Sequence, residues 1–143
     1  MPDVNVLVYA HRQDERWHEG YREWLERSMA GPQPLALSVL VAAGFIRVVT
    51  NPRIFPDPTP TAVALAAIDN IASHPGCRVV TPGPDHLAEV SRLCRAVAAA
   101  GKHVSDAQNA AVAIAEGATW VTRDDDFARF AQHGLSWQHL SLG

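Results

Sequence analysis

The alternation of apolar and polar positions along the chain predicts helices that are separated by short strands. In residues 13–29, Trp17, Tyr21 and Trp24 recur at helical spacing on one face, and glutamates fill the remaining positions, which is typical of an amphipathic helix. Similar patterns predict helices over residues 39–50, 61–73, 84–100 and 106–116, and a helical turn over residues 124–130. Short apolar runs predict strands over residues 4–10, 35–38, 77–81, 118–122 and 135–140.

Turn-forming residues separate these segments. Four prolines make residues 51–60 a loop. Gly101 is expected to end the helix at 84–100, and Gly117 the helix at 106–116, because glycine is favoured just past a helix C-terminus. Ser105 is expected to cap the start of the second of these helices. Strands that alternate with helices predict an α/β fold with a parallel central sheet flanked by helices.

The composition is that of an ordinary globular protein, with 143 residues of which 48% are hydrophobic and 19% charged. We therefore expect one domain over residues 1–143. Cys77 and Cys94 lack zinc-binding spacing and are too few for a disulfide scaffold, so free thiols and a cytoplasmic location are expected. No apolar stretch is long enough to span a membrane, and no signal-peptide pattern is present. The net charge of -3 predicts no overall basic surface for nucleic acid.

The aspartates suggest a candidate site. Asp124 follows the predicted strand at 118–122, and ligands of parallel α/β sheets bind beyond the carboxyl ends of strands. Asp106 begins a predicted helix, and Asp3 precedes an apolar segment. If the fold brings these acids together, their repulsion must be offset by protonation or by a cation. Mg²⁺ and Mn²⁺ prefer such oxygen ligands, so the sequence predicts a divalent-metal site.

Each acid taken alone also has a simpler interpretation. Asp106 beside Ser105 suits helix capping, the run at residues 124–126 suits a solvated helix start, and Asp3 suits the surface. The histidines show no metal-binding spacing, so surface or packing roles are expected for them. A receiver domain or a haloacid-type phosphatase also clusters aspartates, but both need a lysine late in the sheet. Lys102, the single lysine, precedes the third acidic block and does not fit.

Four segments, taken in order, resemble the motifs of one family. They are the opening Asp3-Val4-Asn5 with residues 6–10, the segment GFIRVVTNPRIF at 44–55, the segment at 105–118 that begins Ser105-Asp106-Ala107, and the segment VTRDDDFARF at 121–130. Together they resemble the PIN-domain ribonucleases, and within them the VapC toxins of bacterial toxin–antitoxin pairs. The resemblance implies a PIN-like three-layer domain. It also implies that the first strand ends near Asp3 and that residues 5–10 are helical.

The resemblance implies a metal-dependent endoribonuclease that uses Mg²⁺ or Mn²⁺. It implies that Asp3, Asp106 and Asp124 are carboxylate ligands and that Asp126 is a fourth, more variable acid. Metal-activated water would then attack the RNA phosphodiester.

Neighbouring residues and partners follow from the same resemblance. Asn5 and Thr122 are expected to orient the carboxylates. Arg47 and Arg53 are candidates for contacts with RNA phosphates or with partner carboxylates, although a structural salt bridge explains each equally well. The family further implies a homodimer, a VapB-type antitoxin that covers the site, and structured RNA, often transfer RNA, as substrate.

The chain departs from the family pattern in two places. The family usually carries a further glutamate or aspartate on the helix of the second block, yet residues 35–47 contain no acid, and Val39 or Gly44 stands at the expected position. Only Met1 and Pro2 precede Asp3, where the first strand needs more residues. The first departure leaves a second hypothesis open, that of a weakened or inactive PIN-fold protein that dimerises and binds an antitoxin or RNA.

Overall fold

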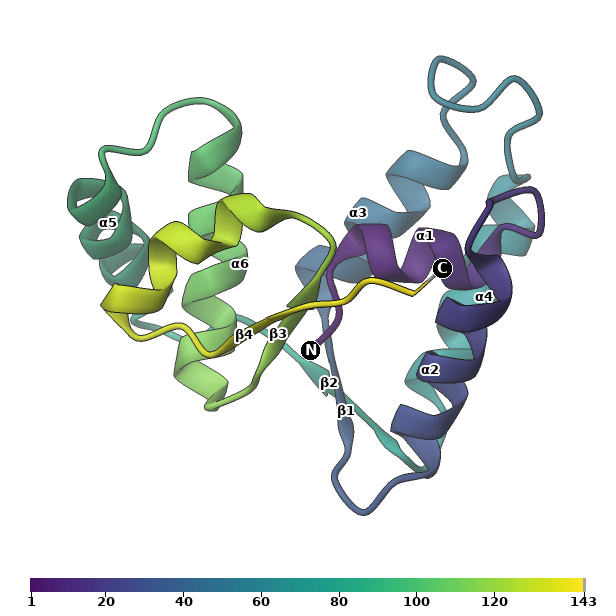
Figure 1. Ribbon diagram of the computed structural model, residues 1–143, viewed down its shortest axis with the longest axis horizontal. Helices are drawn as coiled ribbons and strands as arrows, with labels where there is room; N and C mark the ends of the chain where they lie inside the picture. Colours follow the sequence, from purple (N-terminus) through teal and green to yellow (C-terminus); the bar gives the residue numbers. More distant parts are fainter. Residues whose placement is uncertain (143) are drawn as a thin grey trace.

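In the computed structural model, which describes residues 1–142, helices surround short parallel strands (Figure 1). The elements along the chain are α1 (Val4–His11), α2 (His18–Ala30), β1 (Leu35–Ser38), α3 (Val39–Val49), α4 (Thr61–Ala72), β2 (Cys77–Val80), α5 (His86–Val97), α6 (Lys102–Glu116), β3 (Trp120–Thr122), the 3₁₀ helix η1 (Asp125–His133) and β4 (Trp137–His139). Among the described residues, no helix has the length and apolar character needed to cross a membrane.

The strands pair in parallel. β1 lies beside β2 with Leu35 opposite Cys77, and β3 lies beside β4 with Trp120 opposite Trp137. The N-terminal segment also joins β3 in parallel, because the Asp3 amide donates to the Val121 carbonyl at 2.8 Å. The predicted α/β class with parallel strands is confirmed, and this last pairing fixes Asp3 beside the carboxyl end of β3.

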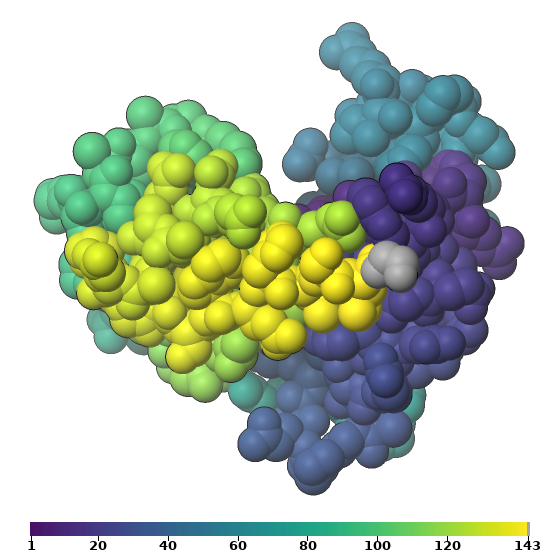
Figure 2. Space-filling model, viewed as in Figure 1, coloured from purple at the N-terminus to yellow at the C-terminus, as the bar shows by residue number. Residues whose placement is uncertain are grey.

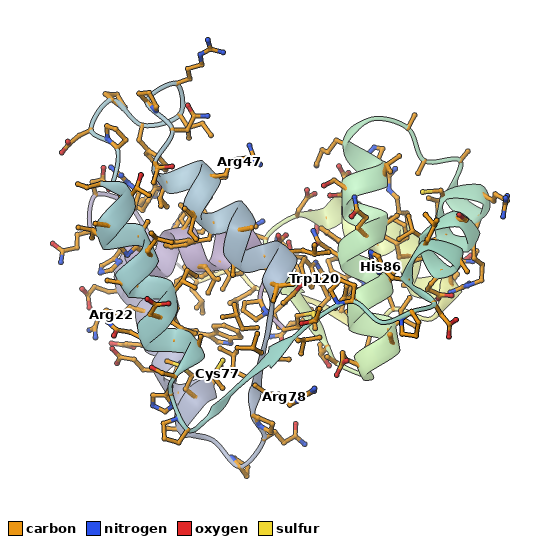
Figure 3. The ribbon with its side chains drawn as sticks, turned by 180° about the vertical axis from the view of Figure 1, so that it is seen from behind. Arg22, Arg47, Cys77, Arg78, His86 and Trp120 are labelled. Carbon is orange, nitrogen blue, oxygen red and sulfur yellow. The ribbon has the colours of Figure 1, made fainter. Side chains whose placement is uncertain are left out.

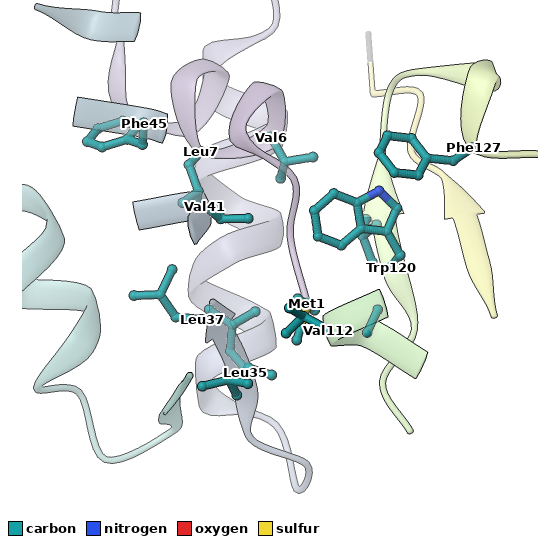
Figure 4. Close-up of a cluster of buried hydrophobic side chains, with 14 of the residues drawn as sticks. Met1, Val6, Leu7, Leu35, Leu37, Val41, Phe45, Val112, Trp120 and Phe127 are labelled. Atoms are coloured by element: carbon teal, nitrogen blue, oxygen red, sulfur yellow. The ribbon is translucent and has the colours of Figure 1, made fainter. Parts of the chain in front are cut away.

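The chain forms two masses that meet along these strands. Helices α1 to α4 lie on one side, and α5, α6 and η1 lie on the other (Figure 1). Buried side chains from both sides form one apolar cluster, in which Leu7 of α1 and Phe45 of α3 lie on one side of the strands (Figure 4). Trp120 is fully buried on the other side, with its ring 5.1 Å from that of Phe127. The shared core holds the two masses together.

The strand predicted over residues 4–10 is wrong, because this segment forms α1. Its β-branched residues favour a strand by propensity, but Val6, Leu7 and Ala10 follow helical spacing and are all buried. The Asp3 side chain accepts a hydrogen bond from the Val4 amide at the start of this helix. The helix at residues 5–10 that the family resemblance implied is therefore the correct one.

The predicted boundary between the two helices near residue 101 is also wrong. α5 ends earlier, at Ala98, which takes the left-handed conformation with φ of 51°. Gly101 precedes α6 with φ of 57°, so it starts the next helix instead of ending α5. Ser105 consequently lies inside α6 and is not its cap. Gly117 does end α6 as predicted, at φ of 61°.

Candidate metal centre

A cavity of about 520 Å³ lies where the two masses meet, and Figure 2 shows the hollow between them. Asp3, Asp106 and Asp124 all line this cavity, although more than a hundred residues separate the first from the last. Ile54 and Phe55 of the proline-rich loop form part of its apolar lining. The fold thus brings three of the predicted site residues to one place.

Asp3 is held rigidly at the end of the N-terminal segment. Its Oδ1 accepts a hydrogen bond from the Val4 amide at 2.6 Å, and its Oδ2 accepts one from the Thr122 hydroxyl at 2.6 Å. The Asn5 side-chain amide donates to the same Oδ2 at 3.3 Å and to the Thr122 hydroxyl oxygen at 3.3 Å. Asn5 and Thr122 therefore both contact this carboxylate.

Burial shapes the electrostatics of Asp3, which is only 8% exposed. Desolvation raises the pKa of Asp3 from 3.8 to about 6, and the charges of Asp106 and Asp124 act in the same direction. The hydrogen bonds from Thr122 and Val4 oppose this rise without cancelling it. Asp3 is therefore a carboxylate whose ionised form gains from a nearby cation.

Asp106 comes from the second turn of α6 and is 7% exposed. Its Oδ2 lies 3.2 Å from Nδ1 of His103, one turn earlier on the same helix. The sequence analysis placed Asp106 at the helix start, where backbone amides would satisfy it. Its actual place in the second turn instead leaves His103 as its hydrogen-bond partner among the described residues.

Asp124 and Asp126 share a partner that the sequence analysis had set aside. Nζ of Lys102 donates to Oδ2 of Asp124 at 2.7 Å and to Oδ2 of Asp126 at 3.0 Å. These two bonds raise the pKa of Lys102 above its usual value. Burial alone would raise the pKa of Asp124, but the bonds from Lys102 and the Asp126 amide outweigh it and lower that pKa.

α3 carries both positions, Val39 and Gly44, at which the acid of the second block was expected, and neither residue is among those that line the cavity. A Cβ atom at Gly44 would lie 2.9 Å from Cγ2 of Val4, which itself lines the cavity. Val48, one turn further along α3, lines the same cavity. Apolar groups thus fill the wall where an acid was expected. Glu15, on the turn after α1, is the one further acid that lines this cavity among the described residues.

The remaining predicted residues lie at the surface. Asp125 is exposed, with 83% of its side chain accessible. Arg47 is exposed on α3 (Figure 3), and Arg53 is exposed on the proline-rich loop. Neither arginine forms an ion pair with any residue that the structure describes. Their predicted contacts with RNA or a partner remain a prediction.

The proline-rich loop that borders the cavity is anchored by a buried arginine. The guanidinium of Arg12, which is 7% exposed, donates to the Asp57 carbonyl at 2.9 Å and to Asp14 at 2.6 Å. It also lies 3.9 Å from the centre of the Phe55 ring, a cation–π contact. Arg12 therefore ties the loop to the end of α1, beside the acids.

Lys102 and His103 are site residues that the sequence analysis missed. It started α6 at residue 106, four residues too late, and so placed both outside the helix. With the true start, Lys102 and His103 lie four and three residues before Asp106, the spacing that puts side chains on one helical face. A helix predicted to start just after Gly101 would have placed both residues on the same face as Asp106.

The donor groups suit a divalent cation. His103, Asp106 and Asp126 each offer one ligand atom, and these atoms lie within 4.8 Å of one another. Asp3 and Asp124 line the adjoining cavity. The carboxylate oxygens suit Mg²⁺ and Mn²⁺, and an added imidazole nitrogen suits first-row transition ions. The residues that are present therefore fit the kind of ion that the family resemblance implies.

Comparison with known sequences identifies related proteins. The PIN domain matches residues 1–132 of the chain. VapC ribonuclease Mb2897 of Mycobacterium bovis is 45% identical over 137 residues, which cover 96% of this chain and 92% of that protein. Ribonuclease VapC31 of Mycobacterium tuberculosis is 40% identical over 129 residues, which cover 90% and 91% of the two chains.

Comparison with solved structures shows the same fold. The chain superposes with a TM-score of 0.71 on a chain of VapBC2 from Rickettsia felis bound to a promoter DNA fragment, at 21% identity and 96% coverage of both chains. VapBC-1 from nontypeable Haemophilus influenzae gives a TM-score of 0.68 at 16% identity, with 96% and 95% coverage.

Proposed function

Since the chain belongs to the PIN-domain family, in its VapC ribonuclease branch, we propose that it is the toxin of a type II toxin–antitoxin pair. Its activity would be Mg²⁺- or Mn²⁺-dependent cleavage of structured RNA. The observation that best supports this proposal is the convergence of Asp3, Asp106 and Asp124 on one cavity beside the carboxyl end of β3.

In such a reaction, some residues of the chain would bind the ion and others would hold its ligands in place. Asp3, Asp106 and Asp124 would hold the divalent ion, with Asp126 as a further acid. A bound ion would make a water molecule a stronger nucleophile and would neutralise charge on the scissile phosphate. Asn5 and Thr122 keep the Asp3 carboxylate fixed, so the site needs little rearrangement when the ion arrives.

The proposal is tested by RNA cleavage with the purified protein. We expect cleavage that requires Mg²⁺ or Mn²⁺, stops with a chelator, and falls at least about 100-fold in Asp106→Asn, because losing a direct ligand exceeds the effect of losing its supporting partners. Asp125→Asn is the matched control, since Asp125 is an exposed acid of the same acidic group. Metal-independent cleavage, or equal activity in both variants, would contradict the proposed role of the acids.

The partners follow from the same proposal. A VapB-type antitoxin would cover the cavity, and the toxin would act as a homodimer in the cytoplasm, with transfer RNA among its possible substrates. The solved structures that share the fold are described as VapBC complexes, which supports an antitoxin partner. Arg47 and Arg53 are exposed and are the arginines we assign to contacts with the antitoxin or RNA.

One observation favours a second candidate function. Gly44 supplies no acid to the cavity wall, and Lys102 already neutralises part of the charge on Asp124 and Asp126. Both features weaken metal binding, so a protein that binds its antitoxin or RNA but cleaves slowly is the alternative. Titration calorimetry with Mn²⁺ and an RNA-binding measurement distinguish the two, because the alternative predicts RNA or antitoxin binding without metal-dependent cleavage.

A further inference from the structure

We propose that His103 is a direct metal ligand beside Asp106 and Asp126, so that the centre binds Mn²⁺ in preference to Mg²⁺. This inference rests on the proposed metal-dependent function and specifies the ligand set of the same site. It assigns a role to a histidine whose sequence context suggested none.

The first argument is the separation of the donor atoms. Nδ1 of His103 lies 3.2 Å from Oδ2 of Asp106. Ligands bound at right angles around one ion, with bonds of about 2.1–2.2 Å, lie about 3 Å apart. Asp126, next to the start of η1, offers an oxygen that lies within 4.8 Å of one ligand atom of His103 and one of Asp106. The His103–Asp106 pair thus has the spacing of neighbouring ligands, and a small side-chain movement brings Asp126 to the same ion.

The second argument is the environment of Asp106. Its side chain is 10% accessible, and His103 is its hydrogen-bond partner among the residues that the structure describes. A buried carboxylate normally gathers several donors, as Asp3 does in the same cavity. Asp106 therefore retains acceptor capacity that a cation shared with His103 would use.

The third argument is the chemistry available on α6. In the first turn of this helix, Lys102 donates hydrogen bonds to Asp124 and Asp126, and His103 is hydrogen-bonded to Asp106. An ammonium group only donates and has no lone pair for a metal, whereas a neutral imidazole has one. Of these two first-turn side chains, His103 is therefore the one that can add a ligand to the carboxylates.

An imidazole ligand changes the preferred metal. Mg²⁺ favours an all-oxygen shell and binds imidazole poorly, whereas Mn²⁺ and later transition ions accept nitrogen ligands readily. A centre in which His103 is a ligand therefore has a larger ratio of Mn²⁺ affinity to Mg²⁺ affinity than a centre built from carboxylates alone.

The experiment measures nitrogen bound to the metal, independently of catalysis. Mn²⁺ is added to the purified protein, and pulsed electron paramagnetic resonance records the modulation from directly coordinated ¹⁴N. We expect ¹⁴N coupling in the wild type and its loss in His103→Gln. His86→Gln is the control, because His86 is also the first-turn histidine of a helix but lines a separate cavity beside later turns of α6.

Titration calorimetry supplies the second measurement. We expect His103→Gln to weaken Mn²⁺ binding at least about tenfold while changing Mg²⁺ binding much less. In His103→Asp, an oxygen ligand at the helix start replaces the imidazole, and we expect Mg²⁺ binding to be kept or strengthened while the preference for Mn²⁺ falls. Circular dichroism checks that both variants remain folded.

The outcomes separate this inference from the function on which it rests. Mn²⁺ binding without ¹⁴N coupling, or equal Mn²⁺ affinity in wild type and His103→Gln, overturns the role of His103 and leaves the carboxylate site intact. A wild type that binds neither ion overturns the metal-dependent function itself. Loss of ¹⁴N coupling in the His86 control as well would overturn the assignment of the coupled nitrogen to His103.

Discussion

The ammonium group of Lys102 lies between two of the proposed metal ligands, 2.7 Å from Asp124 and 3.0 Å from Asp126. A divalent ion that binds these carboxylates must compete with it or share them. The lysine side chain is 59% exposed, so it can move into solvent when an ion arrives. At the scale of single residues, Lys102 would therefore weaken binding of the proposed ion without being a ligand.

Replacing this lysine should strengthen metal binding. In Lys102→Gln, we expect divalent affinity to rise about fivefold, because two partly exposed ion pairs contribute roughly 1 kcal/mol together after solvent screening. Titration calorimetry measures the change, which should shrink at high salt. Arg92→Gln, which removes an ion pair with Glu89 on α5, is the control. Weaker metal binding in Lys102→Gln would show instead that the lysine supports the ion.

The site residues differ in how far the sequence could reveal them. Asp3, Asp106 and Asp124 could be identified because each lies in a segment that resembles a motif of one family. His103 and Lys102 were missed because Ser105 is a better capping residue than Gly101, so the helix was started too late. Backbone conformation decided the boundary, because Gly101 adopts φ of 57° with ψ of -124°, a combination that strongly favours glycine.

At the scale of elements, α1 and α3 approach each other closely at Gly44. A Cβ atom there would lie 2.9 Å from Cγ2 of Val4, a distance that real side chains do not tolerate. Val4 is β-branched and stiff, so it yields little. An acid placed at position 44 would meet the same obstacle, so the packing of the two helices disfavours a metal ligand at this position.

Stability measurements should show this coupling. We expect Gly44→Ala to destabilise the protein by about 1 kcal/mol, because overpacking outweighs the higher helix propensity of alanine. In a Val4→Ala background, the same substitution should become neutral or stabilising, with a coupling energy of about 1 kcal/mol or more. Urea unfolding of the four proteins measures it. Equal effects in both backgrounds would show that the helices adjust freely.

The elements themselves were mostly predictable from the sequence. The helix α3 and the strands β1 and β3 lie close to their expected positions, whereas α2 begins at His18, five residues later than predicted, and ends near its expected residue. The error over residues 4–10 arose because β-branched residues favour strands in isolation, whereas burial against α2 and α3 decides the outcome here. Local preference predicts an element well only where tertiary packing agrees with it.

At the scale of the whole molecule, the buried Asp3 links stability to pH. Its pKa is raised from 3.8 to about 6, so the folded protein holds this proton more tightly than the unfolded chain does. Folding is therefore favoured at low pH, and the contribution of this group falls as pH rises from 3.8 to about 6. The difference between these two pKa values corresponds to roughly 3 kcal/mol of unfolding free energy.

We expect this dependence to be specific to Asp3 and to the metal-free protein. Urea unfolding with a chelator should show that Asp3→Asn lacks the loss of stability that the wild type shows across this pH range. Above the range, adding Mn²⁺ should stabilise the wild type, because an ion that binds only the folded state shifts the equilibrium by mass action, and should stabilise Asp3→Asn much less. Parallel pH profiles for the two proteins would contradict the assignment to Asp3.

Arg12 anchors the proline-rich loop through Asp57 and Phe55, and the loop's Ile54 and Phe55 line the cavity. Ile54 and Phe55 therefore lose conformational entropy when the protein folds, and not when a ligand binds in the cavity. Ordering side chains on binding costs about 0.5–1.5 kcal/mol for each flexible one. A ligand whose shape matches Ile54 and Phe55 as they stand avoids that cost. A ligand of another shape binds less tightly, so the loop makes binding selective for ligand shape.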